Sequence, residues 1–175
     1  MFMKIAVIVS VLIAGILVYA ATRPDTFRVE RSAIINSPPE KIFPLINSFR
    51  LWEAWSPWEK IDPAIQRSYS GADSGKGAVY AWQGNRDIGQ GRMEILESTP
   101  SSKVVIKIDF TQPMEAHNTI EFRLEGQGGS TKVTQAMYGP SSFLSKLVGL
   151  FISMDKMIGQ KFDEGLAGMK SIVEK

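Results

Sequence analysis

The amino terminus carries a long apolar segment unlike anything else in the chain. Residues 5–21 (IAVIVSVLIAGILVYAA) hold no charged side chain and lie between Lys4 and the Arg23-Pro24 pair. A helix needs about 20 apolar residues to cross the hydrocarbon layer of a bilayer, and this run together with residues 1–3 is just long enough. We therefore expect the chain to be anchored in a membrane or exported through one. This divides it into residues 1–25 and a folded domain of residues 26–175.

The sequence supports both fates of this segment. Val18-Tyr19-Ala20 loosely fits a signal-peptide cleavage site, whereas the run is longer than the usual apolar region of a signal peptide. Tyr19 is also suited to a membrane interface. We favour an uncleaved single-pass anchor of the bacterial inner-membrane type, with a secreted or periplasmic domain after cleavage as the alternative. Basic residues lie on both sides of the segment, so they do not decide which face of the membrane carries the domain.

Composition excludes several kinds of site in the rest of the chain. There is no cysteine, which excludes disulfides, thiol nucleophiles and cysteine metal ligands, and His117 is the single histidine. The 20 basic and 18 acidic residues are mixed, with no basic stripe that would track a phosphate backbone. We expect no metal, no cofactor, no catalytic residue and no nucleic-acid partner. A domain of this size is expected to be a monomer.

The pattern of apolar residues after the first segment predicts an α+β domain. Alternation over residues 27–36 indicates a first strand, and Ser37-Pro38-Pro39-Glu40 is typical of a helix start. That short helix should extend to about Ser48, with a kink or restart near Phe43 because Pro44 lacks a backbone donor. Gly and Pro signals then separate six further strands, at residues 66–69, 77–82, 91–97, 103–110, 116–125 and 130–138.

Two helical features frame these strands. Trp52, Trp55 and Trp58 recur at every third residue, which indicates an aromatic lid packed on the core, or alternatively a direct ligand contact. Near the carboxyl end, apolar residues recur at three- and four-residue intervals from Leu144 to Ile172. This pattern predicts one long helix of roughly 30 residues, about 45 Å in length.

Four segments resemble one known superfamily. They are residues 37–43 (SPPEKIF), 52–58 (WEAWSPW), 89–95 (GQGRMEI) and 154–166 (MDKMIGQKFDEGL). Together with the order of elements, they resemble the START and Bet v 1-like (SRPBCC) superfamily, and within it the polyketide cyclase/dehydrase and lipid-transport group. The resemblance implies a helix-grip fold, in which a curved seven-stranded antiparallel sheet wraps around the C-terminal helix and encloses an apolar cavity.

Strand alternation predicts which side chains face that cavity, because successive residues point to opposite faces. Two amides, Asn118 and Gln135, fall on the otherwise apolar inner face, where each either orients a ligand or bonds to a neighbouring group. His117 falls on the outer face, which argues against a catalytic role. The predicted ligand-binding set comprises Trp82, Met93, Ile95, Ile108, Phe110, Asn118, Ile120, Gln135 and Met137 from the strands, and Phe151, Met154 and Ile158 from the helix.

Three glycines, Gly159, Gly165 and Gly168, lie inside the predicted long helix, where each costs about 1 kcal/mol relative to alanine. We interpret them as places where the helix backbone approaches the sheet closely. The alternative interpretation is that they leave room for a ligand.

These observations favour a membrane-tethered domain that binds a small hydrophobic molecule, such as a lipid, a quinone or a polyketide-like ring. One alternative is a cyclase or dehydrase that uses the same cavity, with Tyr80, Asn118 or Gln135 positioning the substrate. Another is an interaction domain with a filled core.

Overall fold

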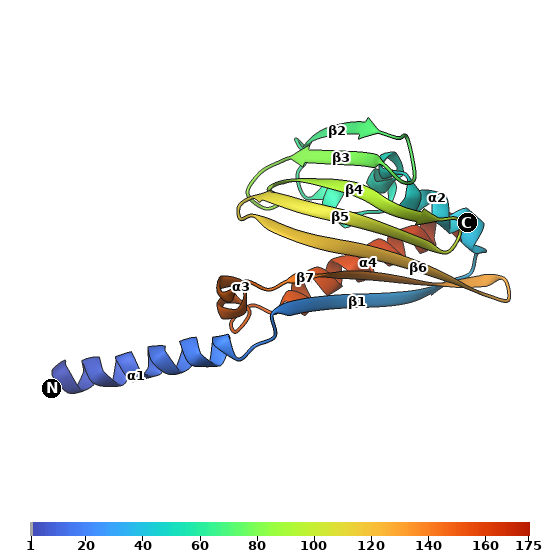
Figure 1. The fold of residues 1–175 in the computed structure, drawn as a ribbon. Helices are drawn as coiled ribbons and strands as arrows, with labels where there is room; N and C mark the ends of the chain where they lie inside the picture. Colours follow the sequence, from blue (N-terminus) through green and yellow to red (C-terminus); the bar gives the residue numbers. More distant parts are fainter. Residues whose placement is uncertain (1) are drawn as a thin grey trace.

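The computed structural model describes residues 2–175. An apolar helix leads into a sheet and its covering helices (Figure 1). In chain order the elements are α1 (Phe2–Ala21), β1 (Thr26–Ile35), α2 (Pro39–Asn47), the 3-10 helices η1 (Phe49–Ala54) and η2 (Pro57–Lys60), β2 (Gln66–Gly71), β3 (Ala78–Gln83), β4 (Gln90–Thr99), β5 (Lys103–Gln112), β6 (Ala116–Gln127), β7 (Ser130–Pro140), α3 (Phe143–Val148) and α4 (Met154–Val173).

The seven strands form one antiparallel sheet in the order β1-β7-β6-β5-β4-β3-β2. Strands β2 to β7 follow one another as a meander, and β1 adds to the far side of β7. Burial alternates along the central strands as the sequence pattern predicted, with Val104, Ile106 and Ile108 of β5 buried and Lys107 exposed. The α+β helix-grip architecture expected from the resemblance is confirmed.

The inner face of the sheet is covered by α4 and by the segment from α2 to η2. Helix α4 packs most extensively against β1 and buries Phe162, Leu166 and Met169. Trp52 and Trp55 are buried edge-on against the ring of Phe122, with ring centroids 6.1 Å away in each case. These two tryptophans therefore belong to the core, as the aromatic-lid interpretation predicted.

The same tryptophans complete the end of α2. The indole N–H of Trp52 donates to the carbonyl oxygen of Ile46 at 3.0 Å, and that of Trp55 donates to Leu45 at 2.9 Å. Carbonyls in the last turn of a helix have no partner within the helix, so the tryptophans supply one. Helix α2 itself continues through Pro44 to Asn47, and the expected restart near Phe43 does not occur.

The prediction of one continuous C-terminal helix is wrong. Two helices occupy that region, α3 and α4, separated by residues 149–153. Gly149 follows the last residue of α3, and Ser153 begins α4 by accepting a hydrogen bond from the backbone N–H of Lys156 at 3.3 Å. Glycine is a weak helix former and serine a favoured N-cap, so the local sequence ends one helix and starts another despite the continuous apolar spacing.

Helix α1 projects away from the domain (Figure 1). It is long and apolar enough to cross a membrane, which fits either an anchor or a signal sequence. Among its residues Ala20 alone is buried, in the last turn, where α1 packs against α3.

Candidate functional site

The structure places most of the predicted ligand-binding residues on the inner face of the sheet, spread from β3 to β7, and on α4, which packs mainly against β1. Eight of them are buried: Trp82, Met93, Ile95, Ile108, Ile120, Gln135, Met137 and Ile158. Two more, Phe110 and Asn118, are half-buried on the same strands. Within the predicted set the inner face is therefore apolar except for the two amides.

Phe151 and Met154 do not join this group. Phe151 lies in the segment between α3 and α4 with 75% of its surface exposed, and Met154 is exposed at the first position of α4. The expectation that both face the interior depended on a continuous helix, and the break at residues 149–153 removes that geometry. Burial on α4 begins one turn later, at Ile158.

Gln135 is the most unusual group on the inner face. It lies in the middle of β7, opposite Phe122 of β6 and Arg31 of β1, and only 5% of its surface is exposed. Its side-chain oxygen Oε1 is fully buried and finds no hydrogen-bond partner among residues 2–175. A buried amide oxygen without a partner costs about 1–3 kcal/mol, so this atom is an acceptor available to a donor from a bound molecule.

Asn118, the second amide, is placed differently. It pairs with Ile108 across the β5–β6 ladder, and its side chain lies against the backbone of Gly139 on β7. A side chain at position 139 would overlap the amide, so the glycine makes the space that Asn118 occupies. The half-buried amide therefore lies nearer than Gln135 to the end of the sheet where β7 leads into α3.

Arg31 is a site residue that the sequence analysis did not select. It lies on the inner face of β1 beside Gln135, and its guanidinium contacts Asp155 of α4 through two bonds, Nη1 to Oδ1 at 2.9 Å and Nη2 to Oδ2 at 2.8 Å. Asp163, two turns further along α4, lies 3.3 Å from Nε. The hydrogen bonds with Asp155 raise the pKa of Arg31 and lower that of Asp155.

The guanidinium of Arg31 occupies space that a side chain at Gly159 would fill. The first turns of α4 are thus held to β1 by one arginine, which is the neighbour of Gln135 across the β1–β7 ladder. Strand parity contains the signal that would have found Arg31, because Phe27, Val29 and Arg31 alternate with the outward Arg28 and Glu30.

A second polar cluster lies deeper, under η2. The hydroxyl of Tyr80 donates to Oε1 of Glu59 at 2.7 Å, and Nε of Arg67 donates to Oε2 at 2.7 Å. Burial and the bond to the Glu59 carboxylate raise the pKa of Tyr80 far above its usual range. Glu59 therefore accepts a hydrogen bond at each of its two oxygens, and the neutral Tyr80 hydroxyl donates to one of them.

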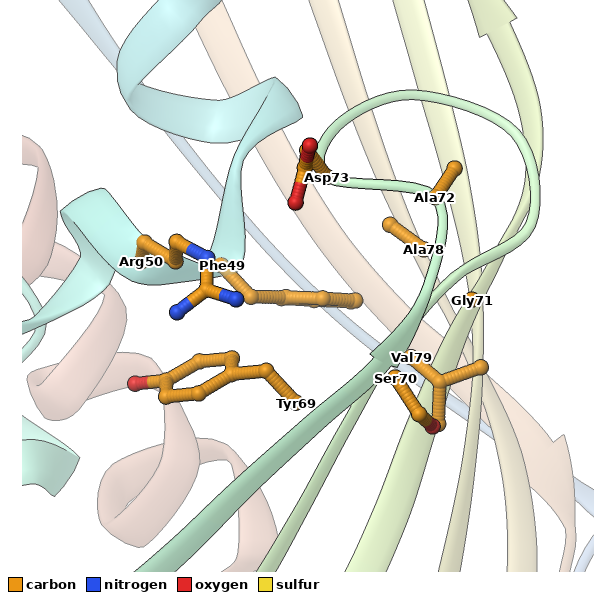
Figure 2. Close-up of a pocket in the computed structure, with 9 residues that line it drawn as sticks. All are labelled: Phe49, Arg50, Tyr69, Ser70, Gly71, Ala72, Asp73, Ala78 and Val79. Atoms are coloured by element: carbon orange, nitrogen blue, oxygen red, sulfur yellow. The ribbon is translucent and has the colours of Figure 1, made fainter.

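Two hollows open on the sheet edge, away from α4. The first, of about 80 Å³, lies between η1 and the β2–β3 turn, where the guanidinium of Arg50 covers the ring of Tyr69 at 4.7 Å (Figure 2). Ligand sites usually enclose about 300–1,000 Å³, so this hollow is too small for a lipid. The second, of about 540 Å³, lies between α2 and the same turn and includes Phe43, Leu51 and Asp73. Neither contains a residue of the predicted set.

The single histidine faces outward. His117 is exposed on β6, and its Nδ1 lies 2.6 Å from Asp109 of β5. This placement matches the parity prediction. Within residues 2–175, no cluster of three or more histidine or carboxylate side chains is arranged to hold a metal ion.

Comparison with known proteins extends the fold assignment to a family. The family described as "Polyketide cyclase / dehydrase and lipid transport" matches residues 26–174. None of the curated proteins matches the sequence.

Several solved structures share the fold at low sequence identity. A protein from Chromobacterium violaceum, CV1439, has a TM-score of 0.59 at 13% identity and covers 87% of this chain and 99% of its own. Ara h 8.0201 has a TM-score of 0.56 at 16% identity, covering 85% and 97%. Protein jhp0584 from Helicobacter pylori has a TM-score of 0.64 at 9% identity, covering 84% and 88%. At these identities the similarity shows the fold alone.

Proposed function

The chain belongs to the family of polyketide cyclases, dehydrases and lipid-transport proteins, and we propose that it is a membrane-tethered domain that holds a small hydrophobic molecule between the sheet and α4. Both activities in the family description involve hydrophobic molecules. The inner face of the sheet is apolar but already buried in the core, so a ligand would enter by displacing the covering helices and would gain about 25 cal/mol for each Å² of its own apolar surface that is buried.

The observation that carries the proposal is the buried, unpartnered Oε1 of Gln135. An acceptor in this position favours a ligand that donates a hydrogen bond, so we infer a hydrophobic molecule with a hydroxyl group. Hydroxylated lipids, quinols and polyketide-like phenols meet this requirement. A bound hydroxyl would recover about 1–3 kcal/mol that the unpaired oxygen costs in its absence.

The first turn of α4 is the expected entrance. Residues 154–157 are all exposed, and the helix becomes buried only from Ile158 onward. Arg31 joins this turn to β1 through Asp155, an ion pair whose acidic partner is well exposed. Exposed ion pairs are weak, so a small outward movement of the turn, which would open the space beside Arg31 and its neighbour Gln135, has a low cost.

Tethering is supported by α1 and by its short connection to the domain. Four residues, 22–25, separate the end of α1 from β1, which would hold the domain at the membrane surface. A hydrophobic ligand then has only a short path from the bilayer to the sheet.

The enzyme alternative gains no support from the polar cluster under η2. Tyr80, the side chain considered for positioning a substrate, donates its hydroxyl to Glu59. The proposal therefore requires no bond to be made or broken.

Native mass spectrometry of the full chain, purified in detergent from its own host, tests the proposal. We expect a dominant adduct of hydroxylated lipid size, and its loss in Gln135→Leu, which keeps the volume but removes the acceptor. Gln160→Leu, an exposed change on α4, is the matched control and should keep the adduct. An empty protein, or an adduct equally abundant in Gln135→Leu, would contradict the assignment.

A further inference from the structure

The segment from α3 to the first turn of α4 exposes an unusual concentration of large apolar side chains. Phe151 is 75% exposed, and Leu144, Ile152 and Met157 are each more than half exposed. We call this surface the apolar rim; it comprises Phe143, Leu144, Val148, Phe151, Ile152, Met154 and Met157. Soluble surfaces rarely gather so many such side chains in one place, so this rim is expected to be covered by something apolar.

The apolar rim is continuous with the membrane-crossing helix of the proposed function. Helix α1 packs against α3, and Ala20 in its last turn is completely buried. The amine of Lys146 in α3 forms an ion pair with Asp25, and the backbone N–H of Ser141 donates to the carbonyl of Asp25 at 2.7 Å. These contacts hold α3 at the level where α1 leaves the bilayer.

The position of the rim within the domain is consistent with a surface that faces the membrane. Figure 1 shows α3 at the end of the sheet that faces α1. The β5–β6 turn lies at the same end, because the start of β6 pairs with the end of β7, and it exposes Met114. The β6–β7 turn, with the polar Gln127, lies at the opposite end.

We propose that the apolar rim inserts into the interfacial layer of the same bilayer that α1 crosses. This inference rests on the tethering in the proposed function and adds a second membrane contact to it. Apolar side chains placed in this layer reach about 5–10 Å into the boundary between headgroups and acyl chains. Exposed Lys156 and Arg23, which flank the rim and the end of α1, are positioned to meet anionic headgroups.

Insertion gives the domain a fixed orientation. A single tether through residues 22–25 leaves the domain free to rotate, whereas a second contact beside α1 holds one end of the sheet against the lipid. That end includes the first turn of α4, where Asp155 pairs with Arg31, the neighbour of Gln135 across the β1–β7 ladder. The expected entrance for the ligand would then open directly into the bilayer, and the ligand would not have to cross water.

The absence of cysteine allows a direct test in the full-length protein. Single cysteines introduced by Phe151→Cys or Ile152→Cys carry an environment-sensitive fluorophore, and the protein is reconstituted in nanodiscs of phosphatidylcholine and phosphatidylglycerol. Val11→Cys in α1 is the reference within lipid, and Gln127→Cys in the β6–β7 turn is the reference in water. Quenching by nitroxide-labelled lipid is compared with quenching by iodide, which reaches both faces of a nanodisc.

We expect the probes at positions 151 and 152 to be quenched by the lipid nitroxide and protected from iodide, unlike the probe at 127. If the probe at 151 is quenched by iodide as strongly as that at 127 while the probe at 11 stays in lipid, the tether stands and the insertion is wrong. If the probe at 11 is itself in water, the tethering in the proposed function fails. Protection of position 151 from both quenchers would show a protein partner or a second copy on the rim and would also overturn the inference.

Discussion

At the scale of single residues, Gly168 shows how closely α4 approaches the segment before η2. A Cβ atom at this position would lie 2.7 Å from the carbonyl oxygen of Trp55 and 3.3 Å from its Cα. Both contacts are with backbone, which has little freedom to move. The helix is therefore closely packed at this glycine, but against Trp55 and not against the sheet, which was the partner expected from the sequence.

Gly168→Ala is expected to destabilise the protein despite the better helix propensity of alanine. The propensity gain is about 1 kcal/mol, whereas overpacking a well-filled core typically costs about 1–3 kcal/mol. Thermal unfolding of the full chain in detergent measures the balance. Gly165→Ala is the matched control, because its Cβ would meet the Trp55 ring at 3.2 Å, a milder contact. A higher melting temperature for Gly168→Ala would contradict this account of the packing.

Tyr80 makes the stability of the domain sensitive to alkaline pH. The pKa of its hydroxyl is raised in the folded state by burial and by the bond to Glu59, while in the unfolded chain it titrates near 10. The folded state therefore keeps a proton that the unfolded state loses. The contribution of this protonated hydroxyl to the free energy of unfolding is complete below about pH 10 and declines as the pH rises further.

We expect the free energy of unfolding to fall above about pH 10, and to fall less steeply in Tyr80→Phe. Urea unfolding followed at several pH values between neutral and strongly alkaline measures the slope. Tyr138→Phe, whose half-buried ring lies under Arg28, is the control and should keep the slope of the unmodified protein. An unchanged slope in Tyr80→Phe would show that this hydroxyl does not carry the effect.

For single residues, strand alternation predicted the direction of a side chain correctly, whereas the sequence did not predict its bonding partners. Alternation placed Gln135 and Asn118 on the inner face and His117 on the outer one, because pleating fixes the direction of each side chain. The same alternation does not reveal partners that are distant in sequence. Glu59 bonds to Tyr80 across 21 positions and Arg31 to Asp155 across 124, so neither contact can be read from local spacing.

At the scale of elements, Arg31 joins the first turns of α4 to β1. Its guanidinium bonds to Asp155 and lies 3.3 Å from Asp163, so a single side chain holds two turns of the helix. Arg31 lowers the pKa of Asp155. The Arg31–Asp155 ion pair therefore contributes its full stabilisation above about pH 4, and this stabilisation is lost as the pH falls below that value and Asp155 becomes protonated.

Arg31→Ala is therefore expected to increase hydrogen exchange at the amides of residues 158–162 while leaving those of residues 166–170 unchanged. Loss of the ion pair frees the exposed end of α4, whereas the buried Leu166 and Met169 still hold its second half. Hydrogen exchange followed by mass spectrometry resolves the two halves. Arg28→Ala, which removes an ion pair with Glu30 on the outer face, should leave both unchanged. Uniform exchange along α4 in Arg31→Ala would contradict the local role.

The elements differ in how much of their structure the sequence predicts. All seven strands lie where alternation and turn residues indicated. In a meander, each strand and turn is determined by residues that are close together in the sequence. The C-terminal helix was predicted too long, because apolar spacing continues through residues 149–153 although Gly149 and Ser153 interrupt the backbone. Phe151 and Ile152 in the gap are exposed, and apolar spacing alone does not distinguish residues that face the core from residues that lie on the surface.

At the scale of the whole molecule, the N-terminal helix α1 contacts the domain, which a cleaved signal peptide would not need to do. Ala20 is buried, the Thr22 hydroxyl donates to the Tyr19 carbonyl at 2.7 Å, and Asp25 pairs with Lys146 of α3. A signal peptide is removed and has no need of contacts with the mature domain. Of these contacts, the burial of Ala20 where α1 packs against α3 involves the segment that cleavage would remove, and it favours retention of α1 over cleavage after Val18-Tyr19-Ala20.

We therefore expect the mature protein to keep residues 1–20. Peptide mapping of protein isolated from host membranes should detect the N-terminal peptide, and the intact mass should match the full sequence. In Ala20→Leu, which removes the small residue that a signal peptidase needs, the intact mass should change only by the substitution itself. The opposite outcome is a mature chain that begins at Ala21, with the full-length chain recovered in Ala20→Leu. That result would show that α1 is a signal peptide. The tether of the proposed function would then be lost, and with it the membrane contact of the apolar rim, which rests on that tether.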